Sequence, residues 1–271
     1  MAKDFGARFR IKPGDRVQLA KRDPADVSAL GKKAATKSKT EKNAETINVL
    51  QDRLYAEGTR ALLVILQGID TAGKDGTIRG VFNHTGPLGV QVRAFKRPSD
   101  DELAHDFLWR AHLSAPPRGY IGIFNRSHYE DVLIGRVRNL APREEIDQRY
   151  DQINDFEKML TENGTVILKF MLHISKDEQK ERLQARLDEK KSRWKFNPGD
   201  IGDRKLWDEY QRAYELMLQR CSTAWAPWHV IPADHKWARN AAIAAIVREK
   251  LEEMNPQYPK PEWDPKDYEI P

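Results

Sequence analysis

The stretch ALLVILQGIDTAGKDGT, Ala61 to Thr77, joins a continuous apolar run to a glycine-rich turn. The run at 61–67 shows no alternation of polar and apolar residues, which is typical of a strand buried on both faces of a parallel sheet. Gly68, Gly73 and Lys74 then follow with the spacing of a phosphate-binding loop (P-loop). Because a strand precedes it and a helical pattern follows, the stretch predicts backbone N–H groups, a helix dipole and a lysine gathered around an anion. A chance glycine-rich turn is the alternative.

The loop departs from the usual P-loop sequence after its lysine. Asp75 stands where a Ser or Thr usually ligates Mg²⁺, and Thr77 comes two residues too late to replace that hydroxyl. Asp70 offers a carboxylate to a hard cation between loop and substrate phosphates, so it is the candidate metal-associated acid. Asp75 is interpreted as capping its own helix, where negative charge is favourable. Besides Lys74, the predicted phosphate- or nucleotide-binding positions of the loop are Gly68, Thr71, Ala72, Gly73, Asp75, Gly76 and Thr77.

Four further apolar runs predict the rest of a sheet, at 90–95, 120–124, 165–172 and 228–233. The segments between them are long enough for helices, and two begin with the spacing of a capping box, at Ser99 with Glu102 and at Ser175 with Glu178. Alternating strands and helices predict an α/β doubly wound fold, with a five-stranded parallel sheet covered by helices on both faces. Ligands bind such sheets beyond the carboxyl ends of the strands, where Gly68, Asn125 and Asp234 would lie.

The third predicted strand ends in polar residues that suit phosphoryl transfer. Asn125 holds the place where many P-loop enzymes have an Asp that fixes Mg²⁺ or its water shell, and Arg126 follows it. An arginine beside the loop would neutralise charge on a transferring phosphoryl group, and Glu130 and Asp131 would complete a metal site. The alternative is an Asn-Arg turn that only caps a helix.

About 55 residues separate the fourth and fifth predicted strands, too many for a tight crossover, so we expect a helical lid over the site at about 182–205. Trp194 and Phe196 would stack on a base or pack inside this lid. Cationic residues also follow the second strand, and together with those of the lid they would clamp a polyanion. The alternative for any single one of them is an ordinary solvent-exposed surface charge. These cations are Lys96, Arg97, Arg182, Arg186, Arg193 and Lys195.

Composition predicts a cytoplasmic, globular protein that does not enter a membrane. Of the 271 residues, 39% are hydrophobic and 32% are charged, and no apolar run approaches the ~18–20 residues of a membrane helix. The N-terminal sequence lacks the apolar core of a signal peptide. The single cysteine, Cys221, excludes a disulfide within the chain and is interpreted as a small, partly buried apolar residue.

The net charge of +5 is unevenly distributed. Residues 1–60 hold 14 Lys/Arg against 8 Asp/Glu, whereas the remaining residues hold 32 against 33. We expect a basic N-terminal arm with an amphipathic helix at 1–58, a P-loop phosphotransferase domain at 59–255 and an extended, proline-rich tail at 256–271. The lysine-rich stretch from Gly31, GKKAATKSKTEK, predicts a mobile linker, either solubilising or a guide for a polyanion.

These motifs, in this order, resemble the polyphosphate kinase 2 family, a group of P-loop kinases similar to thymidylate kinase. The matching pieces are LQGIDTAGKDGTI, DFLWRAH, FNRSHYEDVL, LHISKDEQKERL, RWKF and APWHVIPAD, spread over about residues 55–250. The resemblance implies a three-layer sandwich and assigns catalytic roles to Asp70, Lys74, Asn125 and Arg126. Some subgroups carry Asp in place of Asn125, and FNRSHYEDVL looks most like the single-domain subgroup that accepts AMP and ADP. The first 40 residues and the tail lie outside the matched motifs.

The resemblance implies reversible transfer of the terminal phosphoryl group of inorganic polyphosphate to AMP or ADP, with GDP as a further acceptor. It implies Mg²⁺, with Mn²⁺ as a substitute, no nucleic-acid partner and a homo-oligomer, dimer or tetramer. An ATP-dependent nucleotide kinase would share almost all of these sequence features. A non-catalytic P-loop module that senses nucleotides, or binds nucleic acid through its basic arm, is the alternative of another class.

Overall fold

One parallel sheet of five strands is the centre of the computed structural model, which describes residues 4–270. The strands are β1 (Ala61–Gln67), β2 (Val90–Ala94), β3 (Ile121–Asn125), β4 (Thr165–His173) and β5 (Trp228–Pro232). Their order across the sheet is β2-β3-β1-β4-β5, so β1 is central. All seven residues of β1 are buried, as its unbroken apolar sequence predicts. The five predicted strands are confirmed.

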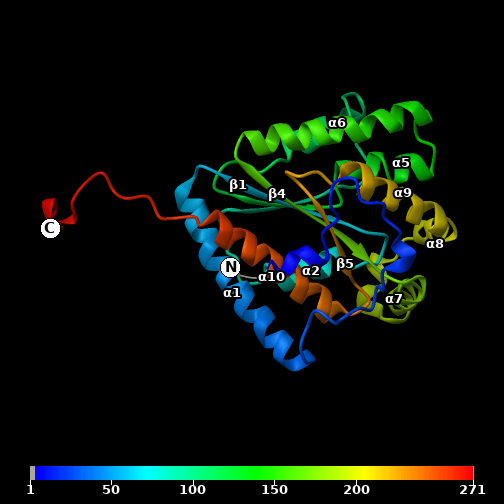
Figure 1. The fold of residues 1–271 in the computed structure, drawn as a ribbon, viewed down its shortest axis with the longest axis horizontal. Coiled ribbons are helices and arrows are strands. Elements are labelled where there is room, and N and C mark those ends of the chain that lie inside the picture. Colours follow the sequence, from blue (N-terminus) through cyan, green and yellow to red (C-terminus); the bar gives the residue numbers. More distant parts are fainter. Residues whose placement is uncertain (1–3, 271) are drawn as a thin grey trace.

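Helices cover both faces of this sheet, as Figure 1 shows. One face carries α1 (Lys33–Glu57), α2 (Lys74–Val81) and α10 (Lys236–Met254); the other carries α5 (Ile134–Val137), α6 (Arg143–Glu162) and α9 (Trp207–Cys221). The shorter α3 (Asp100–Leu103) and α4 (Trp109–Leu113) follow β2, and α7 (Lys176–Asp188) and α8 (Gly199–Lys205) follow β4. The 3-10 helices are η1 (Phe5–Arg8), η2 (Leu19–Lys21), η3 (His128–Asp131), η4 (Lys190–Lys195) and η5 (Pro265–Asp267). The predicted three-layer α/β fold is confirmed.

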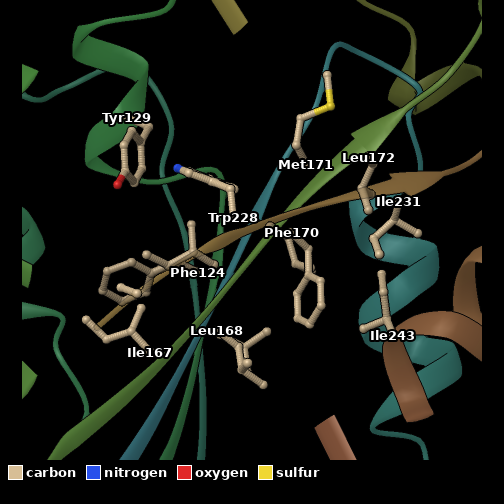
Figure 2. Close-up of a cluster of buried hydrophobic side chains, with 14 of the residues drawn as sticks. Phe124, Tyr129, Ile167, Leu168, Phe170, Met171, Leu172, Trp228, Ile231 and Ile243 are labelled. Carbon is tan, nitrogen blue, oxygen red and sulfur yellow. The ribbon is translucent and has the colours of Figure 1, made fainter. Parts of the chain in front are cut away.

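The core fills the space between the sheet and its helices. Figure 2 shows Phe124 of β3, Phe170 of β4 and Trp228 of β5 among aliphatic side chains of the same strands, and Ile243 of α10 lies on the side of the sheet toward which Phe170 points. The cluster extends into α9, where Tyr210, Tyr214 and Met217 are buried, as their helical spacing predicts. Cys221 at the end of α9 is fully buried, which agrees with its expected apolar role.

A charged network lies inside this core, between β4 and α6. The Lys169 ammonium is fully buried and donates to Glu157 Oε2 at 2.5 Å, to the Tyr129 hydroxyl at 2.8 Å and to the carbonyl of Cys221 at 2.7 Å. Tyr129 donates in turn to Glu157 Oε1 at 2.7 Å. Burial raises the pKa of Glu157, but the adjacent Lys169 and His128 lower it more, so the group stays ionised. A buried charge is tolerated here because its hydrogen-bonding capacity is satisfied.

Helix α1 overturns the expectation of a mobile linker. The helix begins at Lys33, inside the lysine-rich stretch, and continues to Gly58, which ends it in a left-handed conformation at φ 64°. Alanine, lysine and glutamate are strong helix formers, so the stretch is helical without an apolar stripe of its own. Further along, a buried face forms against α10, with Ala44, Ile47, Leu50 and Leu54. The predicted amphipathic helix is therefore confirmed and is longer than expected.

The segment before α1 covers one edge of the sheet. Ile11 N donates to the carbonyl of Trp228 at 2.8 Å, and Val230 N donates to the carbonyl of Phe9 at 2.9 Å, so residues 9–11 lie antiparallel to β5. Apolar side chains of the segment belong to the core: Phe9, Ile11, Val17 and Leu19. The boundaries 1–58, 59–255 and 256–271 stay a prediction, and residues 1–3 and Pro271 lie outside the described residues.

Two expected helix starts differ in detail. At Ser99 the capping box is complete, because the Glu102 carboxylate also accepts from the Ser99 N–H. The helix that begins there nevertheless ends at Leu103, and the next helix begins only at Trp109. At Ser175 the hydroxyl accepts from Glu178 N at 3.0 Å, but the Glu178 carboxylate accepts from Arg182 instead of closing the box.

The proline-rich tail begins along α1 and then leaves the body of the protein. The Tyr258 hydroxyl donates to Asp52 Oδ2 at 2.6 Å, and Figure 1 shows the following residues extending away from the helices. None of the helices described between residues 4 and 270 is long and apolar enough to cross a membrane.

Candidate active site

The glycine-rich turn of the sequence links β1 to α2 and has the shape that its glycines allow. Gly73 is the N-cap of α2 and has a φ of 106°, in the left-handed region that glycine tolerates. A Cβ at Gly73 would also lie 1.8 Å from Nη1 of Arg239, so a side chain here would displace that guanidinium group. The first hydrogen bond of α2 runs from Thr77 N to the carbonyl of Gly73, at 2.9 Å. The N–H groups of residues 74–76 therefore have no partner within the helix and are available to an anion.

Two arginines from other helices hold the carbonyl groups of this loop. Arg182 of α7 donates to the carbonyls of Thr71 and Ala72, at 2.9 and 3.1 Å, and Arg239 of α10 donates to that of Ala72, at 3.2 Å. Arg182 also donates to the carbonyls of Ala233 and Asp234 and, through Nε, to Glu178. All five N–H groups of Arg182 thus have protein acceptors. These bonds fix the loop and leave Arg182 no free N–H donor, so it would add only its charge to the expected clamp on a polyanion.

Lys74 is buried at the floor of the loop. Its ammonium donates to the carbonyl of Gly68 at 2.6 Å, which brings it back across the turn. Burial and the nearby Arg126 lower the pKa of Lys74 to about 8, against the opposite effect of Asp70 and Glu130. The group is therefore a cation at neutral pH that an approaching phosphate would stabilise further.

Asp70 and Arg126 face each other between the P-loop and the end of β3. Arg126 Nη2 donates to Asp70 Oδ1, and Arg126 Nη1 donates to Glu130 Oε2 at 3.1 Å. Glu130 also accepts from Gln67 Nε2 at 3.1 Å, so its carboxylate has two partners. Glu130 raises the pKa of Arg126 despite burial, and Asp70 adds to this effect. The arginine is a fixed positive charge about one third exposed at the cleft.

Asn125 and Asp75 form a second link across the cleft floor. Asn125 Nδ2 donates to Asp75 Oδ1 at 2.7 Å. Asp75 lies in the first turn of α2, where its charge is favourable, but the N-cap position belongs to Gly73 and Asp75 makes no capping bond. The expectation that Asp75 caps its own helix is therefore wrong: its carboxylate accepts from the side-chain amide of Asn125 instead.

These groups line a cleft of about 820 Å³ at the carboxyl ends of β1, β2 and β3. Eight Lys and Arg side chains and five Asp and Glu side chains line it, which favours an anionic ligand. Twelve of the predicted residues lie in its wall: Asp70, Thr71, Gly73, Lys74, Asp75, Gly76, Lys96, Asn125, Arg126, Arg182, Arg186 and Lys195.

The remaining predicted residues do not line the cleft. Gly68, Ala72 and Thr77 are buried beneath the loop, and Glu130 lies behind Arg126. Arg97 is exposed outside the cleft, and Arg193 donates through Nε to the carbonyl of Leu187 at 2.8 Å, beyond the cleft wall.

Asp131 belongs to a separate cluster. Its carboxylate lies 3.8 Å from Nη2 of Arg110 and 3.5 Å from Nη1 of Arg149. Burial raises the pKa of Asp131 to about 6, more than the two arginines lower it. Asp131 therefore pairs with two arginines outside the cleft and does not lie beside Asp70, so the expectation that it completes a metal site there is wrong.

The expected helical segment between β4 and β5 is confirmed as α7, η4, α8 and α9. Arg186 joins its parts, since Nη1 donates to the carbonyl of Lys195 at 3.1 Å and to Asp200 Oδ2 at 3.2 Å. Burial and the charge of Asp70 raise the pKa of Asp200 to about 6. Trp194 is 75% exposed and Phe196 is half-buried, so Trp194 is not part of a lid core.

Sequence reasoning missed three groups that shape the cleft. Arg239 and Lys236 come from the first turn of α10, and Gln179 of α7 donates to the carbonyl of Asp70 at 3.3 Å. Lys236 had a usable signal, because it follows the end of a predicted strand as Lys96 does. Arg239 and Gln179 had none, since their partners lie more than 100 residues away in the chain.

The buried parallel strand, the loop with its lysine and the cationic cleft at the sheet edge together define a phosphotransferase of the P-loop kinase fold. The family model described as Polyphosphate kinase 2 (PPK2) matches residues 30–259. This chain therefore belongs to the polyphosphate kinase 2 family, as its motifs predict.

Known relatives agree with this membership. A Meiothermus ruber protein named AMP/ADP-polyphosphate phosphotransferase is 51% identical over 257 residues, which is 94% of this chain and 96% of that protein. An ADP-polyphosphate phosphotransferase of Rhodopseudomonas palustris is 40% identical over 265 residues, 93% of this chain and 92% of its own. The crystal structure of Polyphosphate Kinase 2 from Arthrobacter aurescens TC1 superposes with a TM-score of 0.94 at 43% identity, covering 98% of this chain and 95% of that one.

Proposed function

We propose that this protein transfers the terminal phosphoryl group of inorganic polyphosphate to AMP or ADP, reversibly and by direct in-line displacement. Support comes from the family and from the names of relatives matched over nearly their whole length. The observation that carries the proposal is that two cations, Lys74 in the loop and Arg126 at the end of β3, line one cleft. A phosphoryl group between them would be neutralised from two sides.

The transfer needs no nucleophile from the protein. An oxygen of the acceptor's terminal phosphate attacks the terminal phosphorus of polyphosphate, the bridging P–O bond breaks, and polyphosphate leaves one phosphate shorter. Lys74 and the N–H groups of residues 74–76 would hold donor phosphates, and Arg126 would stabilise the charge on the moving group. Lys96, Arg186 and Lys195 would bind further phosphates from the sides of the cleft. Positioning and electrostatic stabilisation are the main sources of rate in such reactions.

The residues of the cleft fit a divalent cation that keeps most of its waters. Asp70 is a hard oxygen ligand on the cleft wall, and the buried hydroxyl of Thr71 has no hydrogen-bond partner among the described residues. Mg²⁺ is commonly held by one or two carboxylates together with substrate phosphates, with Mn²⁺ as a substitute. Bound there, the cation would shield the negative charge between donor and acceptor phosphates. Asp70, with Thr71 beside it, is the proposed metal ligand.

The direct test is to incubate the pure protein with Mg²⁺ and long-chain polyphosphate, with AMP, ADP or GDP in parallel, and to separate the nucleotides by ion-exchange chromatography. We expect ADP from AMP and ATP from ADP only when polyphosphate is present, and no product with excess EDTA. A folded Lys74→Ala variant should be slower by roughly 10²–10³-fold. Product formation from ATP but not from polyphosphate would support the ATP-dependent kinase instead.

No turnover with either donor, together with salt-sensitive binding of nucleic acid lost on deletion of residues 1–42, would support the non-catalytic module. The homo-oligomer stays a prediction, which sedimentation velocity would check on the same preparation.

A further inference from the structure

A second groove lies next to the cleft and shares one residue with it. This groove has a volume of about 440 Å³ and runs between the beginnings of α1 and α10, which pack side by side (Figure 1). Lys33 and Lys37 of α1 line it on one side, and His235 and Lys236 line it on the other. Lys236 also lines the larger cleft, so the two spaces adjoin at this residue. We call the second space the outer groove.

The charge of the outer groove is not balanced from within the protein. Among residues 4–270, the lysines that form ion pairs are Lys158, Lys169 and Lys250, so the three lysines of the groove have no acidic partner. The only carboxylate in the wall is Asp234, and its Oδ1 already accepts from Ser175 N at 2.8 Å. An anion in the groove would therefore meet unpaired ammonium groups.

The positions of these lysines are unfavourable for the helices that carry them. Lys33 and Lys37 are four residues apart on α1, so their like charges repel each other. Both lie in the first turns of α1, and Lys236 is the first residue of α10; positive charge opposes the helix dipole at these places. Charges placed against local stability are expected where they serve a function.

We propose that the outer groove binds the part of a polyphosphate chain that extends beyond the reacting phosphates. This inference rests on the proposed function, because the chain would reach the groove from the cleft by way of Lys236. Each internal phosphate of polyphosphate carries a negative charge, and lysine provides mobile point charges that follow a flexible polyanion. The groove makes the enzyme favour long chains, since a donor of only a few phosphates is held by the cleft alone.

The test compares two charge-reversed variants of equal net charge. In one, Lys33→Glu and Lys37→Glu reverse the groove; glutamate suits the first turns of a helix, so α1 should remain folded. In the control, Lys12→Glu and Lys266→Glu reverse two exposed lysines elsewhere. Lys12 follows Ile11, which bonds to the first residue of β5, whereas the groove residues Asp234 to Lys236 follow the last, so Lys12 lies near the opposite end of that strand. Lys266 lies in the tail.

With ADP as acceptor, the KM of the groove variant for long-chain polyphosphate should be about tenfold higher than that of the wild type, because two exposed attractive charge contacts become repulsive. Its kcat, and its KM for linear tetraphosphate, should match the wild type, and the control should match the wild type with both donors. Equal KM values for long-chain polyphosphate in the groove variant and the control would overturn the inference.

Binding of long-chain polyphosphate, measured by calorimetry without nucleotide, separates this inference from the proposed function. If only the groove variant binds polyphosphate more weakly than the wild type, the groove is supported. If the wild type also shows no turnover, the same experiment rejects the proposed function and leaves the groove supported. Equal binding by wild type and groove variant would reject the groove while turnover upheld the function. A wild type that binds no polyphosphate would reject both.

Discussion

Replacing Arg182 with methionine should destabilise the protein more than the loss of any surface arginine. The side chain is 9% exposed and donates to four backbone carbonyls, those of Thr71, Ala72, Ala233 and Asp234. Two of them belong to the P-loop and two follow β5. Methionine has a similar reach but no donor, so the substitution removes the hydrogen bonds while filling much of the space.

The magnitude follows from the carbonyls left behind. The carbonyl of Ala72 keeps its bond from Arg239, whereas those of Thr71, Ala233 and Asp234 keep no partner among the described residues. An unsatisfied buried acceptor costs about 1–3 kcal/mol, and water from the adjoining cleft would relieve part of that. We therefore expect a loss of about 3–5 kcal/mol in the free energy of unfolding. This corresponds to about 6–10 °C in Tm for a chain of this size.

Urea unfolding followed by circular dichroism would measure this loss. Arg193→Met is the matched control from the same segment, because Arg193 is exposed and makes one side-chain hydrogen bond to the described residues, from Nε to the carbonyl of Leu187. The control should stay within about 1 kcal/mol of the wild type. If Arg182→Met also lay within about 1 kcal/mol, Arg182 would not be what holds the loop, and the reasoning from its five hydrogen bonds would be refuted.

Three other perturbations test the site and the core. Since burial lowers the pKa of Lys74 to about 8, kcat/KM for polyphosphate should fall as pH rises through about 8, where the free enzyme loses this charge; a flat profile from pH 7 to 9.5 would contradict it. Lys169→Met should lower the free energy of unfolding in urea by about 3–5 kcal/mol, because it leaves the buried Glu157 carboxylate without its cationic partner. Adding Glu157→Gln should recover most of this loss. If the losses of the two single variants simply added in the double variant, the two residues would not be coupled as a pair. Asn125→Asp should lower Tm by about 2 °C by setting two carboxylates together, and Asp75→Asn in the same chain should restore it.

The sequence predicted the sheet and the centre of the site for physical reasons that act locally. Continuous apolar runs mark buried parallel strands, and the carboxyl ends of such strands meet at one edge, so Asp70, Lys74, Asn125 and Arg126 could be placed together before the fold was seen. Phosphate chemistry then followed from the types of these residues and from the glycines between them.

The supporting contacts could not be predicted in this way. Arg182 and Arg239 reach the carbonyl of Ala72 across 110 and 167 residues of chain, and nothing near them in sequence marks these partners. The start of α1 was missed for a different reason. A lysine-rich stretch has no periodic pattern of apolar residues that would reveal a helix. Its intrinsic helix propensity nevertheless extends the helix that Ile47 and Leu54 anchor on α10.

The strand-like pairing of residues 9–11 with β5 has a consequence for synthesis on the ribosome. Phe9 and Ile11 emerge among the first residues, but their partners Trp228 and Val230 follow more than 200 residues later. At about 5–20 residues per second, the apolar side chains of this segment wait on the order of 10–40 s for the surface that buries them. Closure of the sheet edge is therefore a late step, and the nascent protein presents this segment as a site for chaperones until β5 is complete.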